Sequence, residues 1–316
     1  MSSLKAAVIG AGMMGRHHVR ILGAMSGVDL LYVVDRDTER ATQLASPVGA
    51  AVIADIAELP EVDLAVVAVP TQFHLSVATE LMERGVSVMV EKPLALTVEQ
   101  AESLIATAEK TGVSLGVGHV ERFNPVVRFL TSMELAPSFL QFERLSPYTP
   151  RITTNVISDL MVHDLDLACV LAKSEPIKIE AAAVHVFSDS PDIASAVLTF
   201  ESGAICSLAA SRATQDKVRR IALCEKERYI VADCLRQDVS IKREATVEYP
   251  MSEPNTYRQA NVVEIPYLDR SGEPLTLELL DFVAAVREKR QPTVDGPAGL
   301  RAVRIAAAVE RAAGIL

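Results

Sequence analysis

Near its start the chain reads KAAVIGAGMMG (residues 5–15), a short apolar run that leads into Gly10, Gly12 and Gly15. Residues 6–9 have the length of a buried strand, and the following RHHVRILGAM can continue as a helix. In a GxGxxG turn the glycines allow a tight turn, close approach of a pyrophosphate and close packing of helix on strand. The start of the helix offers unpaired N–H groups and a positive dipole end to phosphates. The stretch therefore predicts dinucleotide binding.

The next expected strand, residues 29–35 (DLLYVVD), ends in Asp35, 20 residues after Gly15. An acid at this spacing usually binds the ribose hydroxyls of NAD, and its charge repels the 2′-phosphate of NADP. Arg36 beside it is able to bind such a phosphate. We therefore expect NAD as the cofactor, with NADP as the alternative.

Strands and helices alternate up to about residue 119. We expect strands at 51–53, 62–69, 86–90 and 113–117, and helices at 38–44, 73–84 and 97–110. This alternation predicts a doubly wound parallel sheet with both faces covered. Ligands of such sheets bind beyond the carboxyl ends of the strands, where the chain places residues 70–74 and the triplet Glu91-Lys92-Pro93.

Beyond residue 120 the pattern changes. We expect strands at 138–145, 177–187, 194–200, 204–210, 218–223, 228–232 and 239–242. We expect helices at 121–133, with an early interruption at Pro125, and at 155–171, 276–289 and 298–313. Strands that follow one another without helices predict a large, open, mostly antiparallel sheet. The fold class is therefore α/β, with a Rossmann domain at residues 1–120 and an α+β substrate-binding and oligomerisation domain at residues 121–316, whose last helix is able to pack back towards the first domain.

Composition limits the location and partners of the chain. The net charge of −10, from 31 basic and 41 acidic residues without a basic block, argues against nucleic acid and anionic membranes as partners. No apolar run approaches the roughly 18 residues that span a bilayer, and the first strand leaves no room for a signal peptide. The cysteines form no CxxC pair, which favours free thiols. We expect a cytoplasmic protein.

Lys92 is the first candidate for chemistry. It follows a buried strand that Pro93 prevents from continuing. A lysine beside a cationic nicotinamide suits the polarisation or deprotonation of a hydroxyl. The alternative is a surface lysine paired with Glu91 in a solvated turn.

The apolar helix expected at 155–171 carries Asp159, His163 and Asp166 at spacings i, i+4 and i+7, so these side chains project from one face. Acid–base catalysis fits this face, because histidine titrates near neutrality and Asp159 can fix its tautomer. The alternative is a structural role, in which hydrogen bonds within the fold satisfy these polar side chains. A metal site is disfavoured, because no cysteine or further histidine stands at ligand spacing.

The motifs GAGMMGRHH, VPTQFH, VEKPLALT, GHVERFNP and DLMVHDLD occur in an order that resembles the Gfo/Idh/MocA oxidoreductases, over essentially the whole chain. The resemblance implies a Rossmann domain and a larger open-sheet domain with the active site between them. It also implies a cis peptide between Lys92 and Pro93, and dimers or tetramers built on the exposed face of the sheet. Met161 stands where many members have glycine.

Site residues follow from the motifs and the resemblance. The expected catalytic residues are Lys92, His163 and Asp159. The residues expected to bind the cofactor are Gly10, Gly12, Met13, Met14, Gly15, Asp35, Arg36, Pro70, Thr71, His74, Glu91 and Lys92. The residues expected to bind substrate are His119, Arg122, Asn124, Asp159 and His163. No metal is expected.

The expected reaction is hydride transfer from a sugar hydroxyl to NAD, with His163 taking the proton, Lys92 holding the oxygen and Asp159 orienting the pair. GHVERFNP together with DLMVHDLD resembles the branch of the family that includes UDP-N-acetylglucosamine 3-dehydrogenases. Arg144, Tyr148 and Arg151 are candidates for contacts with the nucleotide. The alternatives are a free-sugar or inositol dehydrogenase with the same catalytic residues, and a non-catalytic NAD-binding sensor or scaffold.

Overall fold

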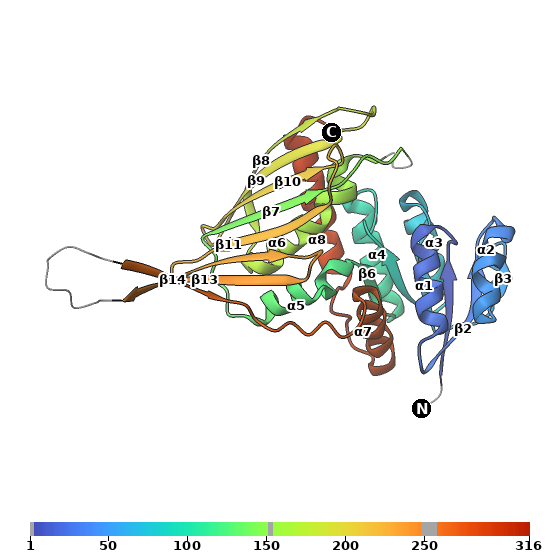
Figure 1. The fold of residues 1–316 in the computed structure, drawn as a ribbon. Helices are drawn as coiled ribbons and strands as arrows, with labels where there is room; N and C mark the ends of the chain where they lie inside the picture. Colours follow the sequence, from blue (N-terminus) through green and yellow to red (C-terminus); the bar gives the residue numbers. More distant parts are fainter. Residues whose placement is uncertain (1–2, 151–153, 248–257) are drawn as a thin grey trace, which may run out of the picture. The chain divides into compact units, whose positions relative to one another are not determined.

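The computed structural model describes residues 3–150, 154–247 and 258–316 (Figure 1). The chain divides into two compact units, Met1–Phe123 with Gly272–Arg304, and Asn124–Ser271 with Ile305–Leu316. The segment Gly272–Arg304, which the sequence assigned to the second domain, therefore belongs to the first unit. Leu275, Leu279 and Phe282 of this segment are buried in the same apolar core as the first strand.

The first unit contains a six-stranded parallel sheet with the order β3-β2-β1-β4-β5-β6 (Figure 1). Its strands are β1 (Leu4–Ile9), β2 (Val28–Val34), β3 (Ala51–Ile53), β4 (Leu64–Val67), β5 (Ser87–Glu91) and β6 (Leu115–Gly118). In register, Ile9 at the end of β1 pairs with Val34 of β2 on one side and with Val67 of β4 on the other. The predicted doubly wound sheet is confirmed. Its strand order reverses beside β1, and ligands bind at this point in such sheets.

Helices cover both faces of this sheet. They are α1 (Met13–Gly23), α2 (Thr38–Ala45), α3 (His74–Glu83), α4 (Val98–Thr111), α7 (Pro274–Glu288) and the first part of α8 (Gly296–Ala312). The apolar residues of α3 and α4 belong to one core, and those of α1, α2 and α7 belong to a second core. Burial on both faces explains the nearly unbroken apolar runs of the strands.

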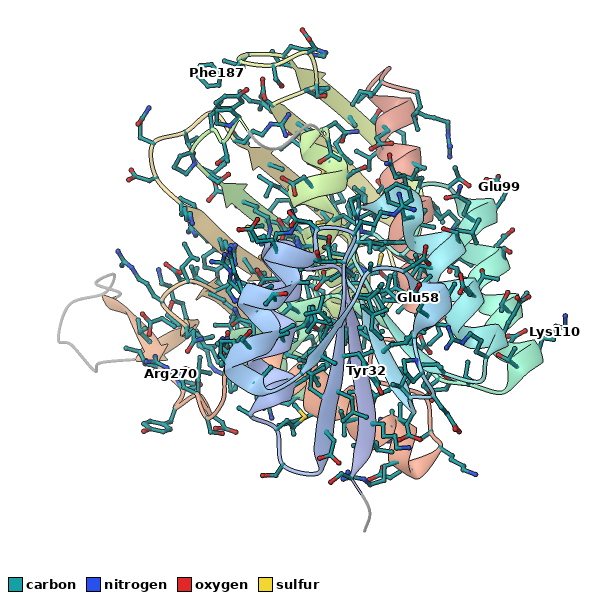
Figure 2. The ribbon with its side chains drawn as sticks, turned by 90° about the vertical axis from the view of Figure 1, so that its right-hand side faces the viewer. Tyr32, Glu58, Glu99, Lys110, Phe187 and Arg270 are labelled. Atoms are coloured by element: carbon teal, nitrogen blue, oxygen red, sulfur yellow. The ribbon has the colours of Figure 1, made fainter. Side chains whose placement is uncertain are left out.

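Helix α4 shows how local sequence sets the boundaries of an element. The Thr97 hydroxyl accepts a hydrogen bond from the Gln100 N–H, and Gly112 ends the helix in the left-handed conformation. Glu99 lies in the first turn and Lys110 in the last, and Figure 2 shows both side chains directed outward from opposite ends of the helix. This distribution of charge complements the helix dipole.

The second unit contains an eight-stranded sheet with the order β14-β13-β12-β11-β7-β10-β9-β8 (Figure 1). Its strands are β7 (Phe139–Leu145), β8 (Pro176–Val184), β9 (Ile193–Phe200), β10 (Ile205–Ser211), β11 (Val218–Cys224), β12 (Arg228–Asp233), β13 (Asp238–Val247) and β14 (Arg258–Glu264). Neighbouring strands are antiparallel except β7 and β10, which run parallel. The predicted sheet is confirmed, but β14 was not predicted because its sequence, RQANVVE, is largely polar without regular alternation.

The helices of this unit are α5 (Pro125–Ser132), α6 (Val162–Ala172) and the end of α8. The single helix expected at 121–133 is instead a 3-10 turn at Val120–Phe123 followed by α5. Pro125 begins α5 rather than interrupting a helix, because the first helical position needs no N–H donor. A π-helical turn, Ile157–Met161, precedes α6 where the sequence predicted regular helix. Helix α6 packs on β7 and β10.

Candidate active site

The glycine turn between β1 and α1 has the geometry that a pyrophosphate requires. A Cβ on Gly15 would lie 1.8 Å from the Gly10 carbonyl oxygen, and one on Gly10 would lie 2.6 Å from the Ala68 oxygen. Gly10 also has a φ of +104°, which favours glycine. Gly12 caps α1, and no atom lies within 4 Å of a Cβ built on it. The start of α1 is therefore open to a phosphate, so the turn fits the cofactor.

Asp35 follows β2 and is held by its own chain. Its Oδ2 accepts a hydrogen bond from the Ala11 N–H at 2.6 Å, and its Oδ1 accepts one from the Asp37 N–H at 2.9 Å. The Arg40 guanidinium lies 3.0 Å and 3.1 Å from the two oxygens. Burial alone would raise the pKa of Asp35, but these hydrogen bonds and the Arg40 charge hold that pKa below its usual value. Asp35 is therefore an ionised acceptor.

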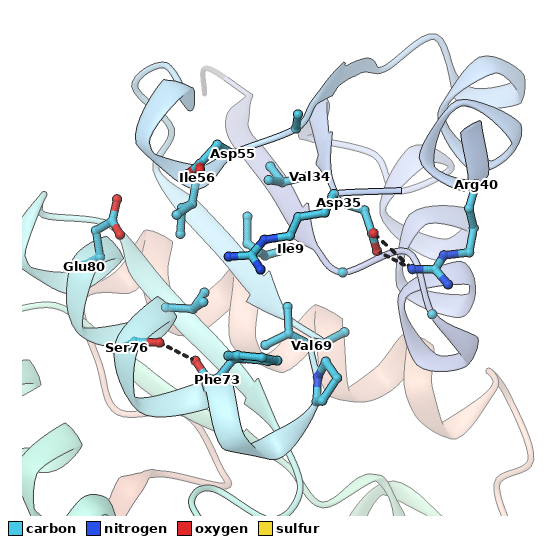
Figure 3. Close-up of a pocket in the computed structure, with 17 residues that line it drawn as sticks. Ile9, Val34, Asp35, Arg40, Asp55, Ile56, Val69, Phe73, Ser76 and Glu80 are labelled. Carbon is cyan, nitrogen blue, oxygen red and sulfur yellow. Dashed lines mark hydrogen bonds and ion pairs between the residues drawn. The ribbon is translucent and has the colours of Figure 1, made fainter. Parts of the chain in front are cut away.

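A cavity of about 520 Å³ opens at the ends of β1, β2 and β4 (Figure 3). This volume is typical of small-molecule sites. Of the residues that the sequence assigned to the cofactor, the cavity is lined by Gly10, Gly12, Asp35, Arg36 and Pro70. The sequence did not identify the lining residues Arg40, Asp55, Ile56, Val69, Phe73 and Glu80. Of these, Arg40 could most readily have been predicted from the sequence, because it lies in the first turn of α2, the helix that follows Asp35.

The other residues assigned to the cofactor are not among the residues that line this cavity. Met13, at the start of α1, is 78 % exposed, whereas Gly15 is buried. Thr71 begins a 3-10 turn, and His74 begins α3 with a side chain only 1 % exposed. Burial lowers the pKa of His74, and hydrogen bonds to backbone carbonyls oppose that shift.

Lys92 directly follows β5, is half-buried, and forms a cis peptide with Pro93, as the resemblance implied. The preceding Glu91 is not in a solvated turn, since only 8 % of it is exposed. Its Oε1 lies 2.7 Å from Nε2 of His18 on α1. Burial alone would raise the pKa of Glu91, but the hydrogen bond to His18 and the charges of His18 and Lys92 hold it below its usual value. Glu91 is therefore ionised.

In the second unit, Asp159 lies in the π-helical turn and His163 in the first turn of α6. Both are half-buried, whereas Asp166 is 1 % exposed, so Asp166 does not share their accessible face. Turns of this kind are frequent at functional sites. Met161 is fully buried in the core, so the side chain that replaces the glycine of many members is directed away from the accessible face.

The Asn155 side chain holds the start of this helical segment. Its Oδ1 accepts hydrogen bonds from the Ile157 and Ser158 N–H groups at 2.9 Å and 3.0 Å. Its Nδ2 donates to Glu310 of α8 at 2.9 Å. The π-helical turn that carries Asp159 is therefore anchored at its first residues.

The remaining residues assigned to substrate differ in accessibility. His119, at the end of β6, is 1 % exposed, and Arg122 is half-buried in the following 3-10 turn. Asn124 is 6 % exposed. Its Oδ1 accepts from the Val126 N–H and its Nδ2 donates to the Cys234 carbonyl, so it caps α5.

Of the three residues suggested for the nucleotide, Arg144 is placed differently from that expectation. The Arg144 guanidinium donates to both carboxylate oxygens of Asp164, at 2.9 Å and 2.6 Å, and only 4 % of Arg144 is exposed. Tyr148 packs against Phe187 with ring centroids 5.1 Å apart. Arg151 lies outside the described residues.

Two further findings concern metal binding and membrane-spanning helices. Among the described residues, no group of three or more His, Cys, Asp or Glu side chains is arranged to hold a metal ion. In the same part of the chain, every helix is too short or too polar to cross a bilayer.

Comparisons with known proteins agree with this architecture. A family model described as "Oxidoreductase family, NAD-binding Rossmann fold" matches residues 4–119, and the model of the GFO/IDH/MocA C-terminal domain matches residues 139–230. The chain is 34 % identical to UDP-N-acetylglucosamine 3-dehydrogenase of Acidithiobacillus ferrooxidans over 317 residues, which covers 98 % of each protein. A solved structure of that enzyme matches with a TM-score of 0.91 at 33 % identity, covering 100 % of this chain and 99 % of the other.

More distant relatives are named for other substrates or pathways. Inositol 2-dehydrogenase of Mycolicibacterium smegmatis is 31 % identical over 205 residues, 61 % of this chain and 58 % of the relative. The structure of GenD2 from gentamicin A biosynthesis, in complex with NAD, matches with a TM-score of 0.82 at 25 % identity, covering 99 % of this chain and 95 % of the other. Taken with the glycine turn and the two sheets, these matches show that the chain belongs to the Gfo/Idh/MocA family of NAD-binding oxidoreductases.

Proposed function

We propose that this chain is an NAD-dependent dehydrogenase that oxidises the C3 hydroxyl of UDP-N-acetylglucosamine to a ketone. The observation that carries the proposal is the 34 % identity to an enzyme of that name over 98 % of both proteins. The similarity to inositol 2-dehydrogenase covers only 61 % of this chain. Similarity over the whole length includes the second unit, to which we assign recognition of the substrate.

The first unit supplies the cofactor site of this proposal. The open N-terminus of α1 at Gly12 accommodates the pyrophosphate, and the ionised Asp35 accepts hydrogen bonds from the ribose hydroxyls. Arg40 keeps the Asp35 carboxylate oriented towards the cavity. When bound, NAD accepts the hydride from the sugar carbon.

The chain's own residues handle the proton and the oxygen. We assign to His163 the removal of the hydroxyl proton, to Lys92 a hydrogen bond to the hydroxyl oxygen, and to Asp159 the orientation of the imidazole. Lys92 belongs to the first unit, and Asp159 and His163 belong to the second. The proposal therefore requires that residues of both units reach the same hydroxyl during turnover.

Reduction of NAD across a panel of substrates tests the proposal. The panel contains UDP-N-acetylglucosamine, other UDP-sugars, free hexoses and inositols, and NADH absorbance is the readout. We expect kcat/KM to be highest for UDP-N-acetylglucosamine. Reduction of the product with borodeuteride, followed by NMR, locates the oxidised carbon, and deuterium at a position other than C3 would contradict the assignment.

Variants test the residue roles. Lys92→Met and His163→Ala are expected to remove turnover while NAD affinity, measured by calorimetry, stays nearly intact. Lys110→Met and His185→Ala, at exposed positions, are the matched controls and should turn over as the wild type does. Normal turnover by either site variant would remove that residue from the mechanism.

Two other functions remain as outcomes of the same assay. A free-sugar or inositol dehydrogenase, favoured by the inositol 2-dehydrogenase match, would turn over an unactivated sugar or inositol faster than any UDP-sugar. A sensor or scaffold would bind NAD and reduce none with any member of the panel.

We further propose that the protein acts in the cytoplasm as a homodimer or homotetramer built on the outer face of the second sheet. Phe139 and Ile205 are direct register partners on β7 and β10, and both are exposed, as is Val197 on β9. Light scattering after gel filtration is expected to give an oligomer for the wild type and a smaller species for Ile205→Glu. A monomeric wild type would contradict this, and cell fractionation checks the location.

A further inference from the structure

We propose that His18 and His74 are positioning residues that hold Lys92 from both sides, through Glu91 and Pro93. The inference rests on the proposed function, in which Lys92 binds the substrate hydroxyl. It assigns a role to two buried histidines that the catalytic mechanism does not otherwise use.

His18 fixes the residue before Lys92. It is 0 % exposed and lies on α1, the helix that begins at the glycine turn. Its Nε2 lies 2.7 Å from Oε1 of Glu91. Because Glu91 is ionised, its carboxylate can only accept, so Nε2 carries the proton and donates. Charge-assisted hydrogen bonds of this kind are among the stronger ones.

The other oxygen of Glu91 is also confined. Its Oε2 accepts a hydrogen bond from the backbone N–H of Lys92 at 3.3 Å. A Cβ on Gly118 of β6 would lie 3.1 Å from this oxygen, so a larger residue there would press on the carboxylate. Glu91 therefore joins α1 to the backbone of the lysine itself.

His74 fixes the residue after Lys92. Its Nδ1 lies 3.0 Å from the Pro93 carbonyl oxygen, and its Nε2 lies 3.0 Å from the Val69 carbonyl oxygen. A neutral imidazole has one N–H and donates to one of these carbonyls at a time, whereas the protonated ring donates to both. Val69 lines the cofactor cavity. His74 therefore connects that cavity wall to Pro93.

The two contacts have a common consequence. The backbone on each side of Lys92 is tied to a segment that forms the cofactor site, the helix after the glycine turn on one side and the turn after β4 on the other. The position of the Lys92 ammonium group thus depends on the cofactor-binding loops rather than on the lysine side chain alone. Reacting groups must be placed closely, and a displacement of about 1 Å costs on the order of a hundredfold in rate.

The test compares variants that keep or remove each N–H. Glutamine at position 18 places an amide N–H close to that of Nε2, and asparagine at position 74 places one close to Nδ1, whereas leucine removes both donors. The variants are therefore His18→Gln, His18→Leu, His74→Asn and His74→Leu. His17→Leu, at the exposed neighbouring position of α1, is the matched control.

Three quantities are measured for each variant: kcat, the NAD dissociation constant, and the rate at which Lys92 is acetylated relative to the exposed Lys110, by mass spectrometry. We expect His18→Leu and His74→Leu to lower kcat by about ten- to a hundredfold, with NAD affinity changed less than about threefold. In these leucine variants the ratio of Lys92 to Lys110 labelling should change by about threefold or more. The polar variants His18→Gln and His74→Asn should recover most of the wild-type kcat and most of the wild-type labelling ratio. His17→Leu should match the wild type.

The outcomes separate this inference from the proposed function. If the leucine variants weaken NAD binding as much as kcat and leave the labelling ratio unchanged, the histidines support the cofactor site only, and the inference is overturned. If the wild type oxidises no member of the panel, the proposed function fails, but the labelling ratio still decides whether the histidines position Lys92. If His18→Leu does not fold, Glu91→Gln removes the charged acceptor of the same contact, and an unchanged labelling ratio in that variant likewise refutes the inference.

Discussion

Replacing Glu278 of α7 by glutamine is expected to make the first unit more stable at neutral and alkaline pH. Glu278 is 1 % exposed, and neither of its carboxyl oxygens has a hydrogen-bond partner among the residues that the structure describes. Burial, followed by the negative charges of Glu91 and Asp281, raises its pKa well above the ordinary value of 4.5. Glu278 therefore stays protonated in the folded protein at pH values where the unfolded chain has lost that proton.

The size of the effect follows from this difference in protonation. A carboxyl group with a raised pKa contributes stability that is fully present below pH 4.5, its unfolded value, and is lost as the pH rises towards the folded pKa. Across that window the folded state holds one proton more than the unfolded state, so the free energy of unfolding falls by about 1.4 kcal/mol per pH unit. Glutamine has the shape of the neutral acid and no titrating group, so it removes this loss.

Urea denaturation of wild type and Glu278→Gln at pH 5, 6 and 7 measures the difference. Because the chain contains no tryptophan, far-UV circular dichroism is the suitable probe. Other titrating groups are common to both proteins and cancel, so the advantage of the variant should grow from one pH to the next, by about 1.4 kcal/mol per pH unit at most. Glu278→Met, which leaves no buried polar group, should be at least as stable as the glutamine variant.

Parallel stability curves for wild type and variant would refute the reasoning, because they would mean that Glu278 titrates alike in the folded and unfolded states. Destabilisation by both glutamine and methionine at every pH would also refute it, since the carboxyl group would then have a favourable partner.

Three further outcomes are expected. Gly15→Ala places a Cβ 1.8 Å from the Gly10 carbonyl oxygen of the glycine turn and should abolish NAD binding, measured by calorimetry. Retained affinity for NAD would show that the turn tolerates a side chain at this position. Asp35→Ser removes the repelling carboxylate and leaves Arg40 available to a 2′-phosphate, so the ratio of kcat/KM for NADP to that for NAD should rise by about tenfold or more, a change of about 1.4 kcal/mol. Arg212→Leu leaves the Asp192 carboxylate buried without its ion pair and should lower the free energy of unfolding by about 3–5 kcal/mol. Burial would raise the pKa of Asp192, but backbone N–H groups and Arg212 hold that pKa far below 3.8. The loss of unfolding free energy in the variant, measured by urea denaturation, should therefore be complete above pH 3.8 and smaller in stronger acid. A loss that does not change with pH would argue against the ion pair.

The sequence by itself determined those features that depend on residues close together in the chain. The glycine turn, the acid at the end of the second strand and the caps of α4 follow from local backbone requirements, such as the space that Gly15 leaves for the Gly10 carbonyl. The alternation of strands and helices was sufficient to predict the parallel sheet, and the runs of strands without helices were sufficient to predict the mostly antiparallel one. The family resemblance further drew attention to Lys92, Asp159 and His163, whose roles stay predictions.

Only the tertiary structure decided which distant segments meet. Helix α7 has an apolar face that could pack on either sheet, and its burial in the core of β1 could not be read from its own residues. The contact of His18 with Glu91 joins residues 73 positions apart, and Arg144 forms an ion pair with Asp164 instead of remaining available to a nucleotide. The physical reason is that α7 gains free energy by burying apolar side chains against a finished sheet. Buried charged groups such as Glu91 and Arg144 instead need a partner that the packing of helices on sheets brings to them, so neither kind of contact can be read from a local run of sequence.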